Sequence, residues 1–118
     1  TTVLDAVVIE GSFSSYQEIA REKLSLSWLS WPFQPLAYIL VSDQYAPQDV
    51  IKNISPIPLL VIHGDNDPIV PIHHGKKIFA LAGEPKWFWR IKGGKHINSM
   101  LCCDGMYRDK LLKFLGDL

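Results

Sequence analysis

The fold is decided by the stretch Pro58–Pro71, which reads PLLVIHGDNDPIVP. It opens with an unbroken apolar run, Leu59–Ile62, followed by His63 and Gly64. Such a run is typical of a short strand buried on both faces, as in a parallel sheet. The chain then enters a turn rich in Asp, Asn and Pro, so carboxylates gather just beyond the carboxyl end of the predicted strand. Open α/β sheets place their ligands and catalytic groups at this edge.

A second predicted strand repeats this arrangement one helix later. Residues Lys86–Ile91 predict a strand that runs into the loop Gly93–His96. Asp67 therefore follows one predicted strand and His96 follows the next, at the same edge of a parallel sheet. An acid after one strand and a histidine after the next form the second half of a nucleophile–acid–histidine order. The first half is not found, because the 118 residues contain no G-x-S-x-G motif.

The rest of the chain alternates between predicted strands and helices. We expect a first strand at Val3–Ile9 and then a helix with Ser14 or Ser15 as its cap. Gly83 is positioned to end a later helix in the left-handed conformation. Apolar periodicity predicts further helices at residues 36–41, 47–54, 72–82 and 107–118. This order predicts an α/β architecture of three parallel strands with flanking helices.

An irregular excursion is expected between the first two helices. Residues Ser25–Pro35 break the helical period, and two prolines interrupt them. Trp28, Trp31 and Phe33 crowd this segment, which we expect to hold large apolar side chains near the mouth of a cleft. Two interpretations stay open, namely a lid or substrate-binding wall and ordinary apolar packing beneath a loop.

Composition limits the classes of function. Twelve Lys and Arg balance twelve Asp and Glu, so no chain-wide field attracts nucleic acid or an anionic membrane. Hydrophobic residues make up 47% of the 118 residues, enough for a core in one domain or part of one. No apolar run approaches the roughly 18 to 20 residues that a membrane span needs, and no signal pattern is found. We expect a cytoplasmic or cytosol-facing protein and leave open a membrane anchor upstream of Thr1.

Neither the cysteines nor the histidines predict a metal or a cofactor. A disulfide between the adjacent Cys102 and Cys103 would be strained, so two reduced thiols are expected. The adjacent His73 and His74 would point about 100° apart on a helix, which makes a poor metal pair. His63 is expected to satisfy backbone groups at the end of its strand. We therefore predict no metal and no cofactor.

Asp67 and His96 are the residues to which we assign catalysis. A triad acid accepts a hydrogen bond from the histidine ring, fixes the tautomer and stabilises the imidazolium that forms. Asp65 lies on the same turn and is the competing candidate. Either aspartate can instead simply shape the turn, because Asp and Asn cap and bend backbone. The histidine after the next strand favours the catalytic interpretation of Asp67.

Three segments resemble the α/β-hydrolase superfamily. Ile62–Pro71 is similar to its acid-bearing H-G-x-x-D-x-x-V-P segment, and Gly93–His96 resembles its histidine loop. Asp5–Tyr16 is similar to the sixth sheet strand of the esterase and peptidase-like hydrolases. The resemblance covers nearly the whole chain and is least diagnostic over residues 24–40. Within the superfamily, the chain looks most like the peptidase-like, often membrane-associated serine hydrolases.

The resemblance implies that residues 1–118 are the C-terminal segment of an α/β-hydrolase domain, with Asp67 as triad acid and His96 as triad base. A serine would attack the ester, thioester or amide carbonyl of a small-molecule or lipid-like acyl substrate, and water would hydrolyse the acyl-enzyme. The nucleophile and the oxyanion donors would come from the N-terminal part of the same domain, which is the implied partner. The chain alone is expected to be inactive.

Two other classes of function are considered. A non-catalytic binding or interaction module derived from the hydrolase fold is the alternative. A metal- or phosphate-binding domain is disfavoured, because the sequence shows no ligand cluster and no glycine-rich phosphate loop. If the chain is part of a larger hydrolase domain, the first strand lacks a neighbouring strand from the N-terminal part. Its open edge would then present unpaired N–H and C=O groups and would favour self-association.

Overall fold

The computed structural model describes residues 4–36, 39, 42–44, 46–97, 99, 101 and 103–118. A parallel sheet of three strands lies at its centre, in the order β1 (Val7–Glu10), β2 (Leu59–Gly64) and β3 (Lys86–Ile91). The α-helices are α1 (Tyr16–Ser25), α3 (Pro47–Val50), α4 (Ile72–Leu81) and α5 (Met106–Gly116). Short 3₁₀ helices cover Trp31–Phe33, Ile51–Asn53 and Cys103–Gly105.

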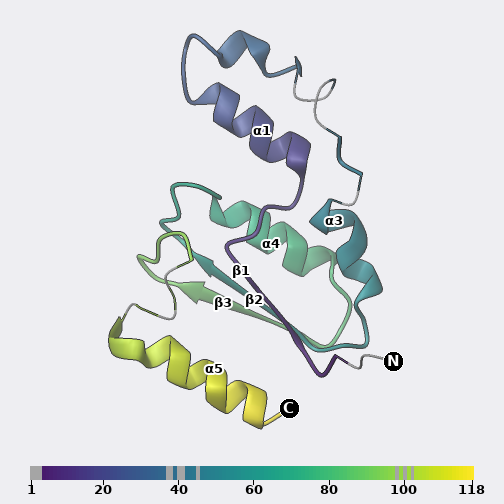
Figure 1. The fold of residues 1–118 in the computed structure, drawn as a ribbon, viewed down its shortest axis with the longest axis vertical. Coiled ribbons are helices and arrows are strands. Elements are labelled where there is room, and N and C mark those ends of the chain that lie inside the picture. Colours follow the sequence, from purple (N-terminus) through teal and green to yellow (C-terminus); the bar gives the residue numbers. More distant parts are fainter. Residues whose placement is uncertain are drawn as a thin grey trace.

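The sheet is covered on both faces, as Figure 1 shows. Helix α4 lies over one face and α5 lies over the other, while α1 and the excursion that follows it lie beyond α4. Every residue of β2 is buried, because the side chains of this central strand alternate between the two layers. Leu59 and Val61 pack with Ile78 of α4, whereas Leu60 and Ile62 pack against the α5 side. The predicted strand buried on both faces is confirmed.

Strand β1 starts later than the sequence predicts, at Val7 rather than Val3. Its pairing with β2 begins at Val7 opposite Leu59, and the amide of Val7 donates to the carbonyl of Pro58. The ladder cannot extend further back along the neighbouring chain because Pro56 and Pro58 carry no N–H group. Among the described residues β1 pairs with β2 alone, so its other side is an edge of the sheet.

Two helix boundaries differ from the predictions. Gly83 is not a left-handed helix stop, because α4 ends at Leu81 and Ala82 is already extended with φ −69° and ψ 149°. A glycine is needed there for a different reason, since a Cβ on Gly83 would lie 2.7 Å from the Cβ of Ser55. The helix predicted at residues 47–54 divides into α3 and a 3₁₀ turn.

Two other helix predictions are confirmed, and one falls mainly outside the described residues. The N-cap of α1 is Ser15, whose hydroxyl accepts from the amide of Glu18 at 3.1 Å. Helix α5 packs on β3 through Phe114, whose ring centroid lies 4.9 Å from that of Trp87. The helix predicted at residues 36–41 falls mainly outside the described residues, and so does the Cys102–Cys103 pair.

Candidate active site

Asp67 is held rigidly on the turn that follows β2. Its Oδ1 accepts hydrogen bonds from the amides of Ile69 at 2.8 Å and Val70 at 2.9 Å. Aspartate side chains commonly accept from backbone amides two and three residues ahead, so this turn is a local structure. The carboxylate side chain is fully buried. Its second oxygen, Oδ2, is therefore aimed at one fixed position.

His96 occupies that position. Its Nδ1 lies 2.8 Å from Asp67 Oδ2, which confirms the predicted contact between the two side chains. A carboxylate only accepts, so Nδ1 carries the proton and the neutral ring keeps Nε2 unprotonated. The ring is partly exposed, with 24% of the side chain accessible. An imidazole in this tautomer and orientation can take a proton at Nε2 from a neighbouring hydroxyl group.

The ionisation of Asp67 is set by competing effects. Burial by itself raises the pKa of the carboxyl group. The N–H groups of Val70, His96 and Ile69 together outweigh burial, so the pKa of Asp67 is lowered from its ordinary value. Asp67 is thus an anion at neutral pH and can stabilise a protonated His96.

Asp65, the other candidate for the triad acid, binds the loop after β3 instead of His96. Its Oδ1 accepts from the amide of Gly93 at 2.7 Å, and its Oδ2 accepts from Arg90 Nε at 3.1 Å. The Gly93 N–H group is the main reason that the pKa of Asp65 is lowered. Both carboxylate oxygens are therefore engaged with the β3 strand end and its loop. The structure brings Asp67, and not Asp65, to His96.

Close backbone approaches at glycines position the His96 loop, and sequence reasoning missed two of them. A Cβ on Gly64 would lie 2.2 Å from the carbonyl oxygen of Gly94, so the ends of β2 and β3 meet backbone to backbone. Gly11 follows β1 with φ +63°, and its Cβ would lie 3.2 Å from the ring of His96. Gly64 is the last residue of β2 and Gly11 directly follows β1, and a glycine at the end of a strand is the signal that identifies such contacts.

His63 holds the Asp67 turn through a hydrogen bond to its backbone, as predicted for a histidine that satisfies backbone groups. Its ring is fully buried, and its Nε2 donates to the carbonyl of Val70 at 2.7 Å. The same nitrogen lies 3.5 Å from Asp67 Oδ2. Its Nδ1 has no hydrogen-bond partner and packs against Gly75, where a Cβ would lie 2.6 Å away. The neutral ring with its proton on Nε2 therefore fits this place.

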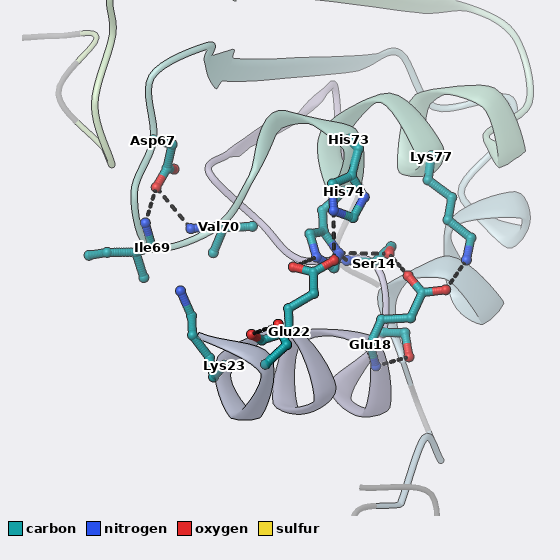
Figure 2. A network of polar contacts seen from close by, with 12 residues as sticks. Ser14, Glu18, Glu22, Lys23, Asp67, Ile69, Val70, His73, His74 and Lys77 are labelled. Carbon is teal, nitrogen blue, oxygen red and sulfur yellow. Dashed lines mark hydrogen bonds and ion pairs between the residues drawn. The ribbon is translucent and has the colours of Figure 1, made fainter. Parts of the chain in front are cut away.

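A second polar cluster, which sequence reasoning missed, lies between α1 and α4 (Figure 2). His73 and His74 do not diverge as expected, because their rings are stacked with centroids 4.2 Å apart. Both reach one carboxylate, that of Glu22. Nearby, burial alone raises the pKa of Glu18, but hydrogen bonds from Lys77 and Ser14 outweigh it and lower that pKa. Glu22 meets the two histidines only because α1 lies beside α4, and no local sequence pattern predicts that arrangement.

The three aromatic residues of the excursion lie on an exposed surface. Trp28, Trp31 and Phe33 are 83%, 60% and 52% exposed. Trp31 lines a cleft of about 360 Å³ together with Arg21, Pro32, Gln34 and Pro35. Neither Asp67 nor His96 lines that cleft, so binding of a substrate by these aromatic residues stays a prediction.

The described helices do not include a membrane span. None of them is both long enough and apolar enough to cross a bilayer.

Comparisons of sequence give relatives but no family model that matches the chain. The chain is 33% identical over 111 residues to the "Uncharacterized protein YfhR" of Escherichia coli (strain K12), covering 93% of this chain and 36% of that protein. It is 29% identical over 93 residues to the "Lysophosphatidylserine lipase ABHD12" of Mus musculus, covering 75% of this chain and 23% of that protein. The chain thus spans about a third of the length of the first curated relatives it matches.

Solved structures share the architecture. An α/β-hydrolase enzyme, MGS-MChE2, from a metagenome of lagoon sediments at Mar Chica superposes with a TM-score of 0.61 and 18% identity, covering 96% of this chain and 50% of that one. The acylaminoacyl peptidase of Pyrococcus horikoshii gives a TM-score of 0.64 at 21% identity, covering 98% and 20%. The chain therefore has the α/β-hydrolase fold, of which it forms three parallel strands and their flanking helices.

Proposed function

We propose that this chain is the C-terminal segment of a serine hydrolase domain, in which Asp67 and His96 are the acid and the base of a catalytic triad. The observation that carries the proposal is the contact of 2.8 Å between His96 Nδ1 and the buried Asp67 carboxylate at the carboxyl edge of the sheet. The fold supports the same reading, since the relatives in structure include a hydrolase and a peptidase.

In the proposed reaction, His96 transfers two protons in succession. Its Nε2 takes the proton of a serine hydroxyl while the serine oxygen attacks the carbonyl carbon of the substrate. Asp67 keeps the ring in place and stabilises the imidazolium, which then gives the proton to the leaving alcohol, thiol or amine. A water molecule, deprotonated by the same nitrogen, then attacks the acyl carbon. The imidazolium returns this proton to the serine oxygen as the bond from the acyl carbon to serine breaks and the acid leaves. No serine of this chain lies in a nucleophile motif, so the nucleophile and oxyanion donors belong to the proposed N-terminal part of the domain.

The substrate class proposed is an acyl ester, thioester or amide, either a small molecule or lipid-like. The name of the mouse relative supports a lipid-like substrate, because it describes a lysophosphatidylserine lipase. Exposed Trp28, Trp31 and Phe33 would supply an apolar wall for an acyl chain. We propose a cytoplasmic or cytosol-facing location and no nucleic-acid partner, in line with a balanced charge.

Hydrolysis of p-nitrophenyl esters by the full-length protein tests the proposal. We expect turnover by the wild type and a fall of about 10³-fold or more for His96→Ala, because the general base is lost. Lys92→Ala, at the end of β3 but outside the pair, is the matched control and should keep wild-type activity. The 118-residue chain alone should be inert. A folded full-length protein whose activity does not depend on His96 would instead favour a non-catalytic role for this pair.

A further inference from the structure

The cluster between α1 and α4 has the make-up of a metal site. Glu22 comes from α1, and His73 and His74 come from the first turn of α4. His73 Nε2 lies 2.6 Å from Glu22 Oε1, and His74 Nε2 lies 2.9 Å from Glu22 Oε2. The ligand atoms of all three side chains fall within 4.8 Å of one another. Two imidazoles and one carboxylate are a common ligand set for zinc and for chemically similar divalent ions.

We propose that Glu22, His73 and His74 bind one Zn²⁺ ion, or another divalent ion that prefers nitrogen ligands, and that this ion fastens α1 to α4. The proposal does not depend on hydrolase activity. His74 is fully buried, whereas His73 is more than half exposed. The site is thus closed on one side and open on the other, which leaves a coordination position for water and a path for the ion to enter.

Coordination requires the three side chains to rearrange locally, because their ligand atoms are at present only within 4.8 Å of one another. Bonds of about 2.0–2.1 Å in a tetrahedron put ligand atoms about 3.3 Å apart. The nitrogen–oxygen distances of 2.6 and 2.9 Å therefore have to open by a fraction of an ångström. The rings of His73 and His74 are stacked with an interplanar angle of 30°, so they have to tilt apart before both ring planes pass through one ion. The exposed ring of His73 has room for this movement.

Binding of an ion would change the hydrogen bonds that His74 makes. Its Nδ1 accepts from the amide of Ser14 at 3.1 Å, so without metal the ring proton sits on Nε2 and faces Glu22. Zinc has to replace that proton, which moves to Nδ1. The hydroxyl oxygen of Ser14 lies 2.9 Å from Nδ1 and can accept there, because its own hydrogen can point to Glu18 Oε2 at 3.0 Å. The Ser14 amide then loses its acceptor, which lowers the affinity for the ion.

A metal at this place would also steady the turn that carries Asp67. Helix α1 reaches that turn through Lys23, whose Nζ donates to the carbonyl of Pro68 at 3.3 Å. Figure 2 shows Lys23 between the cluster and the Asp67 turn. An ion that fixes α1 against α4 thus limits the motion of a helix that contacts the residue next to Asp67.

Calorimetric titration of the full-length protein with ZnCl₂, after treatment with a chelator, tests the proposal. We expect one saturable ion per chain, with an affinity about tenfold or more lower in Glu22→Gln and in His73→Ala. His73 is exposed, so its replacement leaves folding intact where replacement of the buried His74 would not. Asp49→Asn, which removes an exposed carboxylate on α3, is the matched control and should bind zinc as the wild type does.

Thermal unfolding separates a fastening ion from one bound elsewhere. At the same zinc concentration, zinc should raise the midpoint equally for the wild type and for Asp49→Asn, and should raise it less for His73→Ala. Absence of saturable binding by Zn²⁺ and by Co²⁺ would overturn the proposal. The cluster would then only connect α1 to α4 through hydrogen bonds between the two histidines and Glu22. Binding that is unaltered in both Glu22→Gln and His73→Ala would place the ion elsewhere and would overturn it as well.

Discussion

Replacement of Gly64 by alanine should displace the loop that carries His96. The added Cβ would lie 2.2 Å from the carbonyl oxygen of Gly94 and 2.7 Å from that of Lys95, whereas real Cβ contacts stay above 3.0 Å. Both of these neighbours are backbone atoms, so no side chain can turn away to make room. The loop after β3 has to move as a whole.

The cost follows from that movement. Inserting one methyl group into a close-packed contact costs about 1–3 kcal/mol. The amide of Asn66 donates to the displaced carbonyl of Gly94 at 3.0 Å, and losing this bond costs about 1 kcal/mol more. We expect the free energy of unfolding to fall by about 2–4 kcal/mol. The contact between His96 and Asp67 should weaken at the same time, so ester turnover should fall in the protein that remains folded.

Urea unfolding of the full-length protein measures the first effect. Gly116→Ala is the matched control, because a Cβ at this end of α5 meets nothing within 4 Å. Alanine should be neutral or stabilising there by up to about 1 kcal/mol. If Gly64→Ala unfolds with the same free energy as the wild type, the close approach of the two strand ends is refuted.

Four further predictions concern Asp67, His63 and β1. Asp67→Asn should lower kcat of the full-length protein by about 10⁴ with little change in KM, because an amide fixes the wrong tautomer of His96; steady-state kinetics measure this, and a loss below tenfold would argue against the triad. The pKa of Asp67 is lowered from 3.8 on folding, so its anion stabilises the fold fully above that pH, and the contribution is lost as the pH falls through the folded value. Acid unfolding should therefore depend less on pH in Asp67→Asn, and identical profiles would contradict the account. His63→Leu removes the donor to the Val70 carbonyl and should destabilise the protein by about 1–3 kcal/mol in urea unfolding, where an unchanged midpoint would count against this role. The 118-residue chain alone should self-associate through the open edge of β1, as light scattering across a concentration series can show, whereas a monomer at every concentration would exclude it.

Local patterns were sufficient for the features that depend on neighbouring residues. The apolar run of β2 and the Asp-rich turn after it lie within fourteen consecutive positions, so burial, turn and acid could be read together. The position of His96 followed from the rule that parallel strands end at one edge. The N-cap of α1 at Ser15 is equally local.

Features that depend on tertiary approach could not be predicted in this way. Glu22 lies 51 positions before His73 in the sequence, and only the packing of α1 on α4 brings them to 2.6 Å. The late start of β1 reflects the prolines of its neighbour rather than its own residues. Gly83 lies where a glycine would end a helix, yet the close contact with Ser55 is the reason that a glycine is needed there. In each case a distant segment overrides the local signal.

Labelling of the full-length protein with a fluorophosphonate probe tests the central claim most directly, because the probe reacts with an activated serine. Mass spectrometry should find one adduct, on a serine outside residues 1–118, and the labelling rate should fall about a hundredfold or more in His96→Ala. Equal labelling of the wild type and His96→Ala, or an adduct on a serine within the 118 residues, would contradict the assignment of Asp67 and His96 as the acid and base of a serine hydrolase.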